Sequence, residues 1–223
     1  MIEVSTSVLD VEEENSVKTF YNIETAKTDF FHIDVMDGKF VERNNLEKMK
    51  DYALKIHSIS MVPLDVHLMV EEPRKILDDF IDLGVDRISY HLEACRDNEE
   101  VLNIAKYLIE NGVKVGVAVN PDTDIENVYD ILPYVHMILI MSVFPGKGGQ
   151  EFIETSVEKI KKLKEYCTNN DIDIDIEVDG GVNDITASKA VDAGANILVS
   201  GKYIISSDDY SKQIKHLKGM TSL

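Results

Sequence analysis

Residues 30–38 read Phe30-Phe31-His32-Ile33-Asp34-Val35-Met36-Asp37-Gly38. This short run is rich in apolar and β-branched residues and ends in an Asp-Gly pair, which predicts a strand closed by a turn. A helix is predicted next, because the apolar residues between positions 46 and 56 recur at intervals of three and four. This strand followed by a helix is the unit from which we predict the fold.

Similar apolar runs recur along the whole chain, and helical spacing follows them, as in residues 101–109 and 153–163. Eight such units in 223 residues give roughly 28 residues per unit, which is typical of βα repeats with a parallel sheet. The eight predicted strands are Ile2–Val4, Phe30–Val35, Met61–Val66, Arg87–Tyr90, Lys114–Val119, Met137–Met141, Ile172–Val178 and Ile197–Ser200.

A closed (β/α)8 TIM barrel fits this repeat better than an open, doubly wound sheet. Open sheets usually carry a glycine-rich turn after the first strand, whereas here that position reads Ser5-Thr6-Ser7-Val8-Leu9. No linker or change of composition divides the chain, so we expect a single domain over residues 1–223. Its active site should lie at the C-terminal ends of the strands, and the inside of the barrel should be apolar and packed.

The charge and composition exclude several classes of partner. Lys and Arg number 23 and Asp and Glu 41, which gives a formal charge of −18. This charge argues against nucleic acid or an anionic membrane as a partner. No apolar run reaches the length of a membrane span, the N-terminus does not resemble a signal peptide, and Cys95 and Cys167 lie in unrelated contexts. We therefore expect a cytoplasmic protein with reduced thiols; the sequence leaves open whether it forms a homo-oligomer.

Imidazoles and carboxylates follow several of the predicted strands. His32 and Asp34 share one face of the second strand, because their positions differ by two. His67 lies near the end of the third strand and Asp179 at the end of the seventh. Two imidazoles and two carboxylates at one barrel mouth would suit a divalent metal such as Zn, Fe, Mn or Co. His91 and Glu93, after the fourth strand, are placed to support such a site.

Glycines gather after the last three strands, in Pro145-Gly146-Lys147-Gly148-Gly149-Gln150, Asp179-Gly180-Gly181 and Gly201-Lys202. Glycine lets backbone amides approach an anion closely, and the loops after strands seven and eight form the usual phosphate site of this architecture. Ordinary loop glycines are the alternative for any single loop, but three consecutive loops favour a phosphate ligand. Neutral amides, with Lys147 or Lys202, would hold a phosphate within an acidic protein.

Over nearly its whole length the chain resembles the ribulose-phosphate 3-epimerase family. The most specific segments are His32-Ile33-Asp34-Val35-Met36-Asp37-Gly38-Lys39-Phe40-Val41 and residues 145–150. Further matching segments are residues 5–9, 65–70, 91–93, 120–123, 141–144, 178–182 and 194–196. The resemblance implies an enzyme that interconverts D-ribulose 5-phosphate and D-xylulose 5-phosphate by two-aspartate proton transfer at C3.

The resemblance also implies roles for individual residues. His32, Asp34, His67 and Asp179 would bind one divalent metal cation per chain, and Asp34 and Asp179 would be the acid–base pair. Met36, Met69 and Met141 would line the substrate pocket, although ordinary apolar filling explains them equally well. The implied contacts to a phosphorylated ketose are Ser7, His67, Gly146, Lys147, Gly148, Gly149, Asp179, Gly180, Gly181, Gly201 and Lys202.

The sequence departs from the family pattern at a few positions. Glu42 and Arg43 follow Phe40-Val41 where the family usually has Pro and Asn, so the loop after strand two is expected to differ in shape. Lys147 replaces an aromatic residue, Lys202 replaces a small one, and Glu12 stands where Asp is frequent. The geometry of phosphate binding is therefore open.

Three other functions are alternatives to this one. An epimerase for another ketose phosphate, such as allulose 6-phosphate, would use the same catalytic residues. The related decarboxylase and hexulose-phosphate synthase group carries D-x-K-x-x-D on a strand, whereas this chain has His67 and Val70 in place of the Lys and the final Asp. A non-catalytic phosphosugar-binding barrel is disfavoured because no expected metal ligand or catalytic aspartate is missing.

Overall fold

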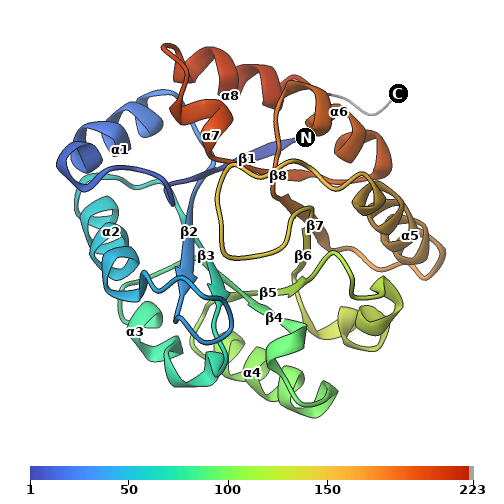
Figure 1. The fold of residues 1–223 in the computed structure, drawn as a ribbon. Helices are drawn as coiled ribbons and strands as arrows, with labels where there is room; N and C mark the ends of the chain where they lie inside the picture. The colour runs from blue at the N-terminus through green and yellow to red at the C-terminus, as the bar shows by residue number, and fades with distance from the viewer. Residues whose placement is uncertain (221–223) are drawn as a thin grey trace.

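The computed structural model describes residues 1–220, in which parallel strands form a closed ring surrounded by helices (Figure 1). Each strand pairs with the next along the chain, and β8 returns to pair with β1. The predicted (β/α)8 barrel is therefore confirmed. The strands are β1 (Glu3–Ser7), β2 (Phe30–Met36), β3 (Leu64–Met69), β4 (Arg87–His91), β5 (Lys114–Val119), β6 (Met137–Met141), β7 (Asp175–Asp179) and β8 (Ile197–Ser200).

Some predicted strand boundaries were wrong. β3 begins at Leu64 and not at Met61, because Pro63 lacks the N–H that a central strand needs. β7 begins at Asp175 and not at Ile172, since the Ile172 amide donates instead to the Cys167 carbonyl at 2.9 Å and closes the preceding helix. β1 extends to Ser7, further than the apolar run indicated.

Helices follow the strands and cover the outside of the ring. The prediction of a helix after every strand was imperfect, because β5 is followed by a 3₁₀-helix, Ile125–Tyr134, that contains Pro133. Proline disfavours continuous α-helical hydrogen bonding. The α-helices are α1 (Ser16–Thr25), α2 (Leu46–Ile59), α3 (Leu77–Ile81), α4 (Asn98–Glu110), α5 (Thr155–Asn169), α6 (Asp184–Ala193), α7 (Lys202–Ile205) and α8 (Tyr210–Lys218). Shorter 3₁₀-helices are Glu13–Asn15, Pro73–Lys75 and Leu92–Ala94.

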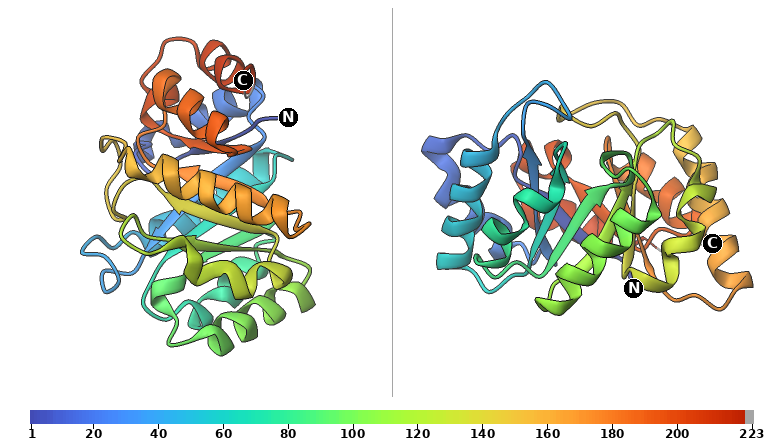
Figure 2. Two further views of the ribbon diagram at one scale, coloured as in Figure 1. Left: turned by 90° about the vertical axis from the view of Figure 1, so that its right-hand side faces the viewer. Right: turned by 90° about the horizontal axis from the view of Figure 1, so that it is seen from below.

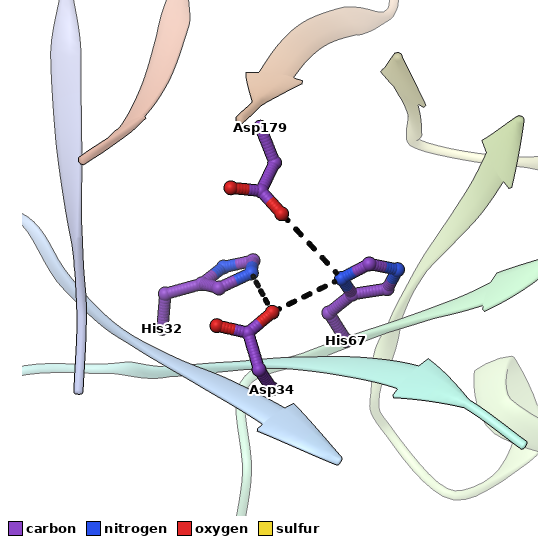
Figure 3. A group of neighbouring side chains, drawn as sticks. All are labelled: His32, Asp34, His67 and Asp179. Carbon is purple, nitrogen blue, oxygen red and sulfur yellow. Dashed lines mark hydrogen bonds and ion pairs between the residues drawn. The ribbon is translucent and has the colours of Figure 1, made fainter. Parts of the chain in front are cut away.

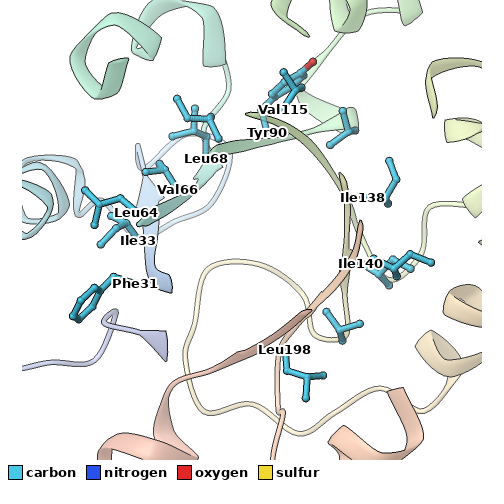
Figure 4. Close-up of a cluster of buried hydrophobic side chains, with 14 of the residues drawn as sticks. Phe31, Ile33, Leu64, Val66, Leu68, Tyr90, Val115, Ile138, Ile140 and Leu198 are labelled. Atoms are coloured by element: carbon cyan, nitrogen blue, oxygen red, sulfur yellow. The ribbon is translucent and has the colours of Figure 1, made fainter. Parts of the chain in front are cut away.

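The main hydrophobic core lies between the strands and the surrounding helices (Figure 4). Alternate strand residues such as Val66, Leu68 and Ile138 point outward and are fully buried there. Side chains on a strand alternate between its two faces, so the residues between them point into the barrel. The outer layer thus supplies the apolar burial that stabilises the fold, and the inner face is available for polar groups.

The inside of the barrel contains a polar layer beside apolar side chains such as Leu139, contrary to the expectation of an apolar interior. An interior polar layer is formed by Ser5, His32, Asp65, Arg87, Ser89 and Glu177, all at most 4% exposed. Ser5 Oγ donates to Asp65 Oδ2 at 2.7 Å, and the Arg87 guanidinium lies 3.7 Å from the centre of the Phe30 ring. Such partners lower the cost of burial for part of the layer. Within residues 1–220, Ser89 Oγ and both carboxyl oxygens of Glu177 have no hydrogen-bond partner.

Two long loops rise from the same end of the barrel and meet above its mouth (Figure 2). One joins β2 to α2 and the other joins β6 to α5. A Cβ at Gly146 would lie 3.3 Å from the Cβ of Val41, which shows how closely the loops approach. Among residues 1–220, no helix has both the length and the apolar character required to cross a membrane.

Removing one buried hydroxyl on α2 tests the packing of the helical layer. Tyr52 is fully buried and donates to the Val11 carbonyl at 2.8 Å, while Lys48 Nζ also contacts that carbonyl at 3.1 Å. Because the carbonyl keeps this second donor, Tyr52→Phe should lower the free energy of unfolding by only about 1 kcal/mol. Urea unfolding measures the loss. Tyr21→Phe is the matched control, since Tyr21 is 61% exposed, and a larger effect there would contradict the interpretation.

Candidate active site

Four side chains from three strands converge inside the barrel mouth (Figure 3). Asp34 Oδ1 lies 3.3 Å from His32 Nε2 and 3.3 Å from His67 Nδ1, and Asp179 Oδ2 lies 3.8 Å from the same His67 nitrogen. One ligand atom from each residue lies within 4.8 Å of the others. The structure thus brings together all four residues that the sequence nominated as metal ligands.

This cluster has the donor set that a divalent cation requires, and one of its ligand nitrogens lacks a hydrogen bond. His32 Nε2 is buried, and within residues 1–220 it has no hydrogen-bond partner, although it faces the Asp34 carboxylate. A buried imidazole nitrogen is normally hydrogen-bonded or bound to a metal. Two imidazoles and two carboxylates are ligands that Zn, Fe, Mn and Co accept. The His32, Asp34, His67 and Asp179 side chains could therefore hold a divalent metal ion.

The electrostatics of the cluster also favour a positive charge. Burial opposes ionisation of His32, yet the carboxylates of Asp34 and Asp65 raise its pKa well above the usual value. Burial likewise opposes ionisation of Asp34, but His32 and His67 hold the pKa of this carboxyl well below its usual range. The space between the carboxylates therefore attracts a cation, whether a proton or a metal ion.

The two carboxyl groups of the cluster have different surroundings. Burial, followed by the nearby Asp34 charge, raises the pKa of Asp179 to about 7. Asp34 is more fully enclosed, and its second oxygen accepts a hydrogen bond from Ser7 Oγ at 2.7 Å. Ser7, which the resemblance nominated as a substrate contact, thus also orients Asp34. Carboxyl groups with separated pKa values are typical of sites that move protons.

Asp65 and Glu177, directly beneath the cluster, were missed by the sequence interpretation. Asp65 Oδ2 lies 2.8 Å from His32 Nδ1, and one oxygen of Glu177 belongs to the same compact group. Burial and the Asp65 charge raise the pKa of Glu177 well above its usual value. The available signal was spacing: Asp65 precedes His67 by two residues and Glu177 precedes Asp179 by two, so each pair shares a strand face.

His91 and Glu93, which the sequence nominated as support for a metal site, lie on the other side of His67 from the cluster. His67 Nε2 is 2.9 Å from His91 Nε2, and His91 Nδ1 is 3.1 Å from Glu93 Oε2. Burial lowers the pKa of His91 to about 4. Despite burial, the hydrogen bond from His91 and further donors lower the pKa of Glu93 to about 2. The pair is therefore a neutral imidazole and a carboxylate.

A pocket opens above the cluster at the C-terminal ends of the strands. Its walls carry the buried thioethers of Met36, Met69 and Met141, as the resemblance implied. His32 and His67 lie deeper, fully buried beneath it. The remaining predicted site residues line the pocket, namely Ser7, Asp34, Gly146, Lys147, Gly148, Gly149, Asp179, Gly180, Gly181, Gly201 and Lys202.

Gly180 and Gly181 have backbone conformations that require glycine. Their φ angles are +120° and +63°, in the left-handed region that other residues rarely adopt. A Cβ at Gly180 would lie 2.5 Å from a Val143 methyl group, and one at Gly181 would lie 2.6 Å from the Phe152 amide nitrogen. This loop therefore packs closely against the β6–α5 loop, and both of its glycines line the pocket.

Two of the departures from the family pattern, Lys147 and Lys202, line the pocket, and Glu42 and Arg43 line the hollow next to it. The Lys202 side chain lies across Gly149, with its Cδ 3.1 Å from where a Cβ would be. Arg43 Nη1 lies 3.8 Å from Asp10 Oδ1. The Asp10 side chain also packs against Gly148, and the sequence did not reveal this second contact. Asp37 closes the β2–α2 turn by accepting from the amides of Lys39 and Phe40, which supports the turn role expected for it.

Solved structures with this fold include enzymes whose names refer to phosphorylated compounds. A 3-hexulose-6-phosphate synthase has a TM-score of 0.73 at 13% identity, covering 99% of this chain and 100% of that one. A phosphoribosylanthranilate isomerase from Thermotoga maritima has a TM-score of 0.66 at 16% identity, covering 99% of this chain and 100% of that one. At these identities the similarity establishes the barrel fold alone.

Curated sequences are much more similar. The chloroplastic ribulose-5-phosphate-3-epimerase of Arabidopsis thaliana is 38% identical over 97% of this chain and 76% of its own length. The ribulose-phosphate 3-epimerase of Bacillus subtilis (strain 168) is 37% identical over 98% of this chain and 99% of its own. The sequence model of the Ribulose-phosphate 3 epimerase family matches residues 3–205, and the chain belongs to this family.

Proposed function

We propose that the protein is a metal-dependent epimerase that interconverts D-ribulose 5-phosphate and D-xylulose 5-phosphate at C3. One observation carries the proposal: the carboxylates of Asp34 and Asp179 reach a single pocket from β2 and β7. These strands are separated by β1 and β8 in the ring, so the two groups approach a bound substrate from different directions. Membership of the epimerase family supports the same conclusion.

Inversion beside a ketone requires a proton to leave one face of the carbon and another to arrive at the opposite face. One of the two aspartates removes the C3 proton, which leaves a planar enediolate in the pocket. The other aspartate, protonated, then delivers its proton to the opposite face. In the reverse direction the two residues exchange roles. Ser7 Oγ donates a hydrogen bond to Asp34 Oδ2 and so keeps the carboxylate oriented during these transfers.

We place one divalent cation, Zn, Fe, Mn or Co, among His32, Asp34, His67 and Asp179. When bound, it would supply positive charge that stabilises the negative charge developing on the substrate oxygens. His32 Nε2, which has no hydrogen-bond partner within residues 1–220, and the two carboxylates support this placement.

The cysteines Cys95 and Cys167 are free thiols, which supports a reducing cytoplasmic location.

The substrate phosphate would bind at the glycine-rich loops after β6, β7 and β8. All three loops line the same pocket, and their glycines let backbone amides approach an anion closely. Lys147 and Lys202 also line it and would add positive charge at the rim. We propose that the amides carry most of the phosphate binding and that the two lysines adjust it.

The first prediction from the proposed function concerns the proton carriers. Asp34→Asn and Asp179→Asn should each lower epimerisation by about 10²–10⁴-fold, because each face of C3 needs its own carrier. Each variant should still exchange the C3 proton with deuterated solvent from one epimer only, as followed by NMR. Asp173→Asn makes the same charge change at an exposed position before β7 and should leave turnover unchanged.

Near-wild-type turnover in both directions by either active-site variant would contradict the two-aspartate mechanism. Running the same assay with pentulose and hexulose phosphates side by side distinguishes the proposed substrate from allulose 6-phosphate. An unaltered C3 proton with every sugar would instead support a binding protein without catalysis.

The second prediction concerns the metal. Protein purified without chelators should contain one divalent ion per chain by elemental analysis, and dialysis against a chelator should abolish activity reversibly. His32→Ala should lose the ion because it removes a ligand nitrogen. His216→Ala alters an exposed histidine and should keep full metal content. Full activity in metal-free protein would overturn the assignment.

The third prediction separates amides from side-chain charge in phosphate binding. A Cβ at Gly201 would lie 3.3 Å from the Ser7 Cβ, so the branched side chain of Gly201→Val would intrude into the pocket and raise KM strongly. Lys202→Ser removes a rim charge and should raise KM only modestly. Steady-state kinetics at fixed, low ionic strength makes the comparison, because salt screens exposed charges. If phosphate binding is lost in Lys202→Ser and retained in Gly201→Val, the Lys202 charge and not the backbone amides would hold the phosphate.

A further inference from the structure

The hydrogen bond between two imidazoles beside the metal cluster restricts where their protons lie. His67 Nδ1 faces the carboxylates of Asp34 and Asp179, while its Nε2 lies 2.9 Å from His91 Nε2. Two unprotonated nitrogens cannot form a hydrogen bond, so one of the two Nε2 atoms carries a proton. If neutral His67 carries it, the His67 Nδ1 lone pair faces the Asp34 carboxylate 3.3 Å away, which is favourable only when a cation lies between them. If His91 carries it, the proton of neutral His67 lies on Nδ1.

On the side of His91 away from His67 lies Glu93, which is held by a backbone amide that can only donate a hydrogen bond. The backbone amide of Asn120 donates to Glu93 Oε1 at 2.8 Å, and the Thr123 hydroxyl donates to the same oxygen. Glu93 is therefore an acceptor, and its second oxygen, Oε2, lies 3.1 Å from His91 Nδ1. A lone pair on His91 Nδ1 would face a carboxylate oxygen unfavourably, so Nδ1 carries the proton. Neutral His91 then has its lone pair on Nε2.

We infer that Glu93 and His91 are positioning residues that fix His67 in its Nε2–H form and thereby direct the Nδ1 lone pair at the metal. This relay, defined as Glu93, His91 and His67, rests on the metal-dependent function proposed above. The Asn120 amide sets the direction of the hydrogen bonds in the relay, because it donates to Glu93. That direction is passed on through the His91 and His67 rings to the metal cluster. A metal ion can bind Nδ1 only when that nitrogen has no proton.

The surroundings of the relay hold it in place. Lys159 on α5 donates to the carbonyls of Asn120, Pro121 and Thr123, which secures the turn that contacts Glu93. The Phe40 ring, from the β2–α2 loop, lies 4.8 Å from the His91 ring, and His91 is fully buried. With a metal ion on His67 Nδ1, His67 Nε2 would be a donor, so the facing His91 Nε2 would accept and the single proton of the His91 ring would lie on Nδ1, toward Glu93.

Glu93→Gln tests the direction of the relay with almost no change in shape. The Asn120 amide should retain the glutamine carbonyl oxygen, so the glutamine NH2 group would face His91 Nδ1. That contact reverses each hydrogen bond, because His91 must then donate from Nε2 and His67 must carry its proton on Nδ1. The expected result is a loss of Zn²⁺ affinity of roughly 10–100-fold, the usual effect of changing a group that orients a metal ligand.

Two measurements report on the variant. Long-range ¹⁵N–¹H NMR of the metal-free protein shows which nitrogen of His67 carries the proton, and competition with a chelating dye gives the Zn²⁺ dissociation constant. Glu99→Gln makes the same charge change at an exposed position on α4 and should leave both unchanged. The His91→Gln variant provides a second control, because its side-chain amide can rotate so that its oxygen accepts from His67 Nε2. Adding Glu93→Gln to that variant should change the Zn²⁺ dissociation constant less than twofold.

The relay is overturned if Glu93→Gln leaves His67 in the Nε2–H form with Zn²⁺ affinity within twofold of the wild type. It is also overturned if affinity falls while the tautomer stays the same, since Glu93 would then act only through the 120–123 turn. Failure of the metal proposal looks different. The wild-type protein would not bind Zn²⁺ stoichiometrically, whereas the NMR result on metal-free protein would still report the tautomer.

Discussion

The imidazole of His32 lies between two buried carboxylates, and much of the barrel interior is arranged around this contact. Asp65 Oδ2 is 2.8 Å from one ring nitrogen and Asp34 Oδ1 is 3.3 Å from the other. Carboxylates are costly to bury unless positive charge accompanies them. The interior polar layer meets part of this demand through the charge of Arg87, which acts on Asp65, while Ser5 donates a hydrogen bond to the same carboxylate. The remainder is met at the mouth of the barrel, where a cation can bind.

A polar interior requires that the fold be stabilised elsewhere. The outward faces of the strands and the apolar faces of the helices form the large hydrophobic core outside the ring. Because the two faces of a strand alternate along the sequence, one strand contributes to both regions. Ile33 and Val35 of β2 belong to the outer core, while His32 and Asp34 belong to the site. The separation lets a charged site exist within a stable barrel.

The barrel and most of the pocket were predictable from the sequence because both follow from local patterns. Eight apolar runs with helical segments between them specify the ring, and residues at the C-terminal ends of its strands must meet. Asp65 and Glu177 were not identified, since the rule that barrel interiors are apolar directs attention away from inward residues below the strand ends. The contact of Asp10 with Gly148 joins the loop after β1 to the β6–α5 loop, and no local pattern encodes such a meeting of loops.

The strongly acidic charge of the chain and an anionic substrate are compatible because the pocket and the general surface use different chemistry. The net charge of −18 acts at long range and is screened by salt, whereas backbone amides act only at contact distance. Three glycine-bearing loops bring their backbones to one pocket, and Lys147 and Lys202 are located at the same place. Salt weakens the long-range repulsion between the acidic protein and an anion, whereas the amide dipoles remain oriented. Backbone amides can therefore hold an anion in spite of the net charge of the chain. Under the proposed function, discrimination among sugar phosphates would depend on the shape of the space between these loops and the cluster, whose apolar lining includes Met36, Met69 and Met141.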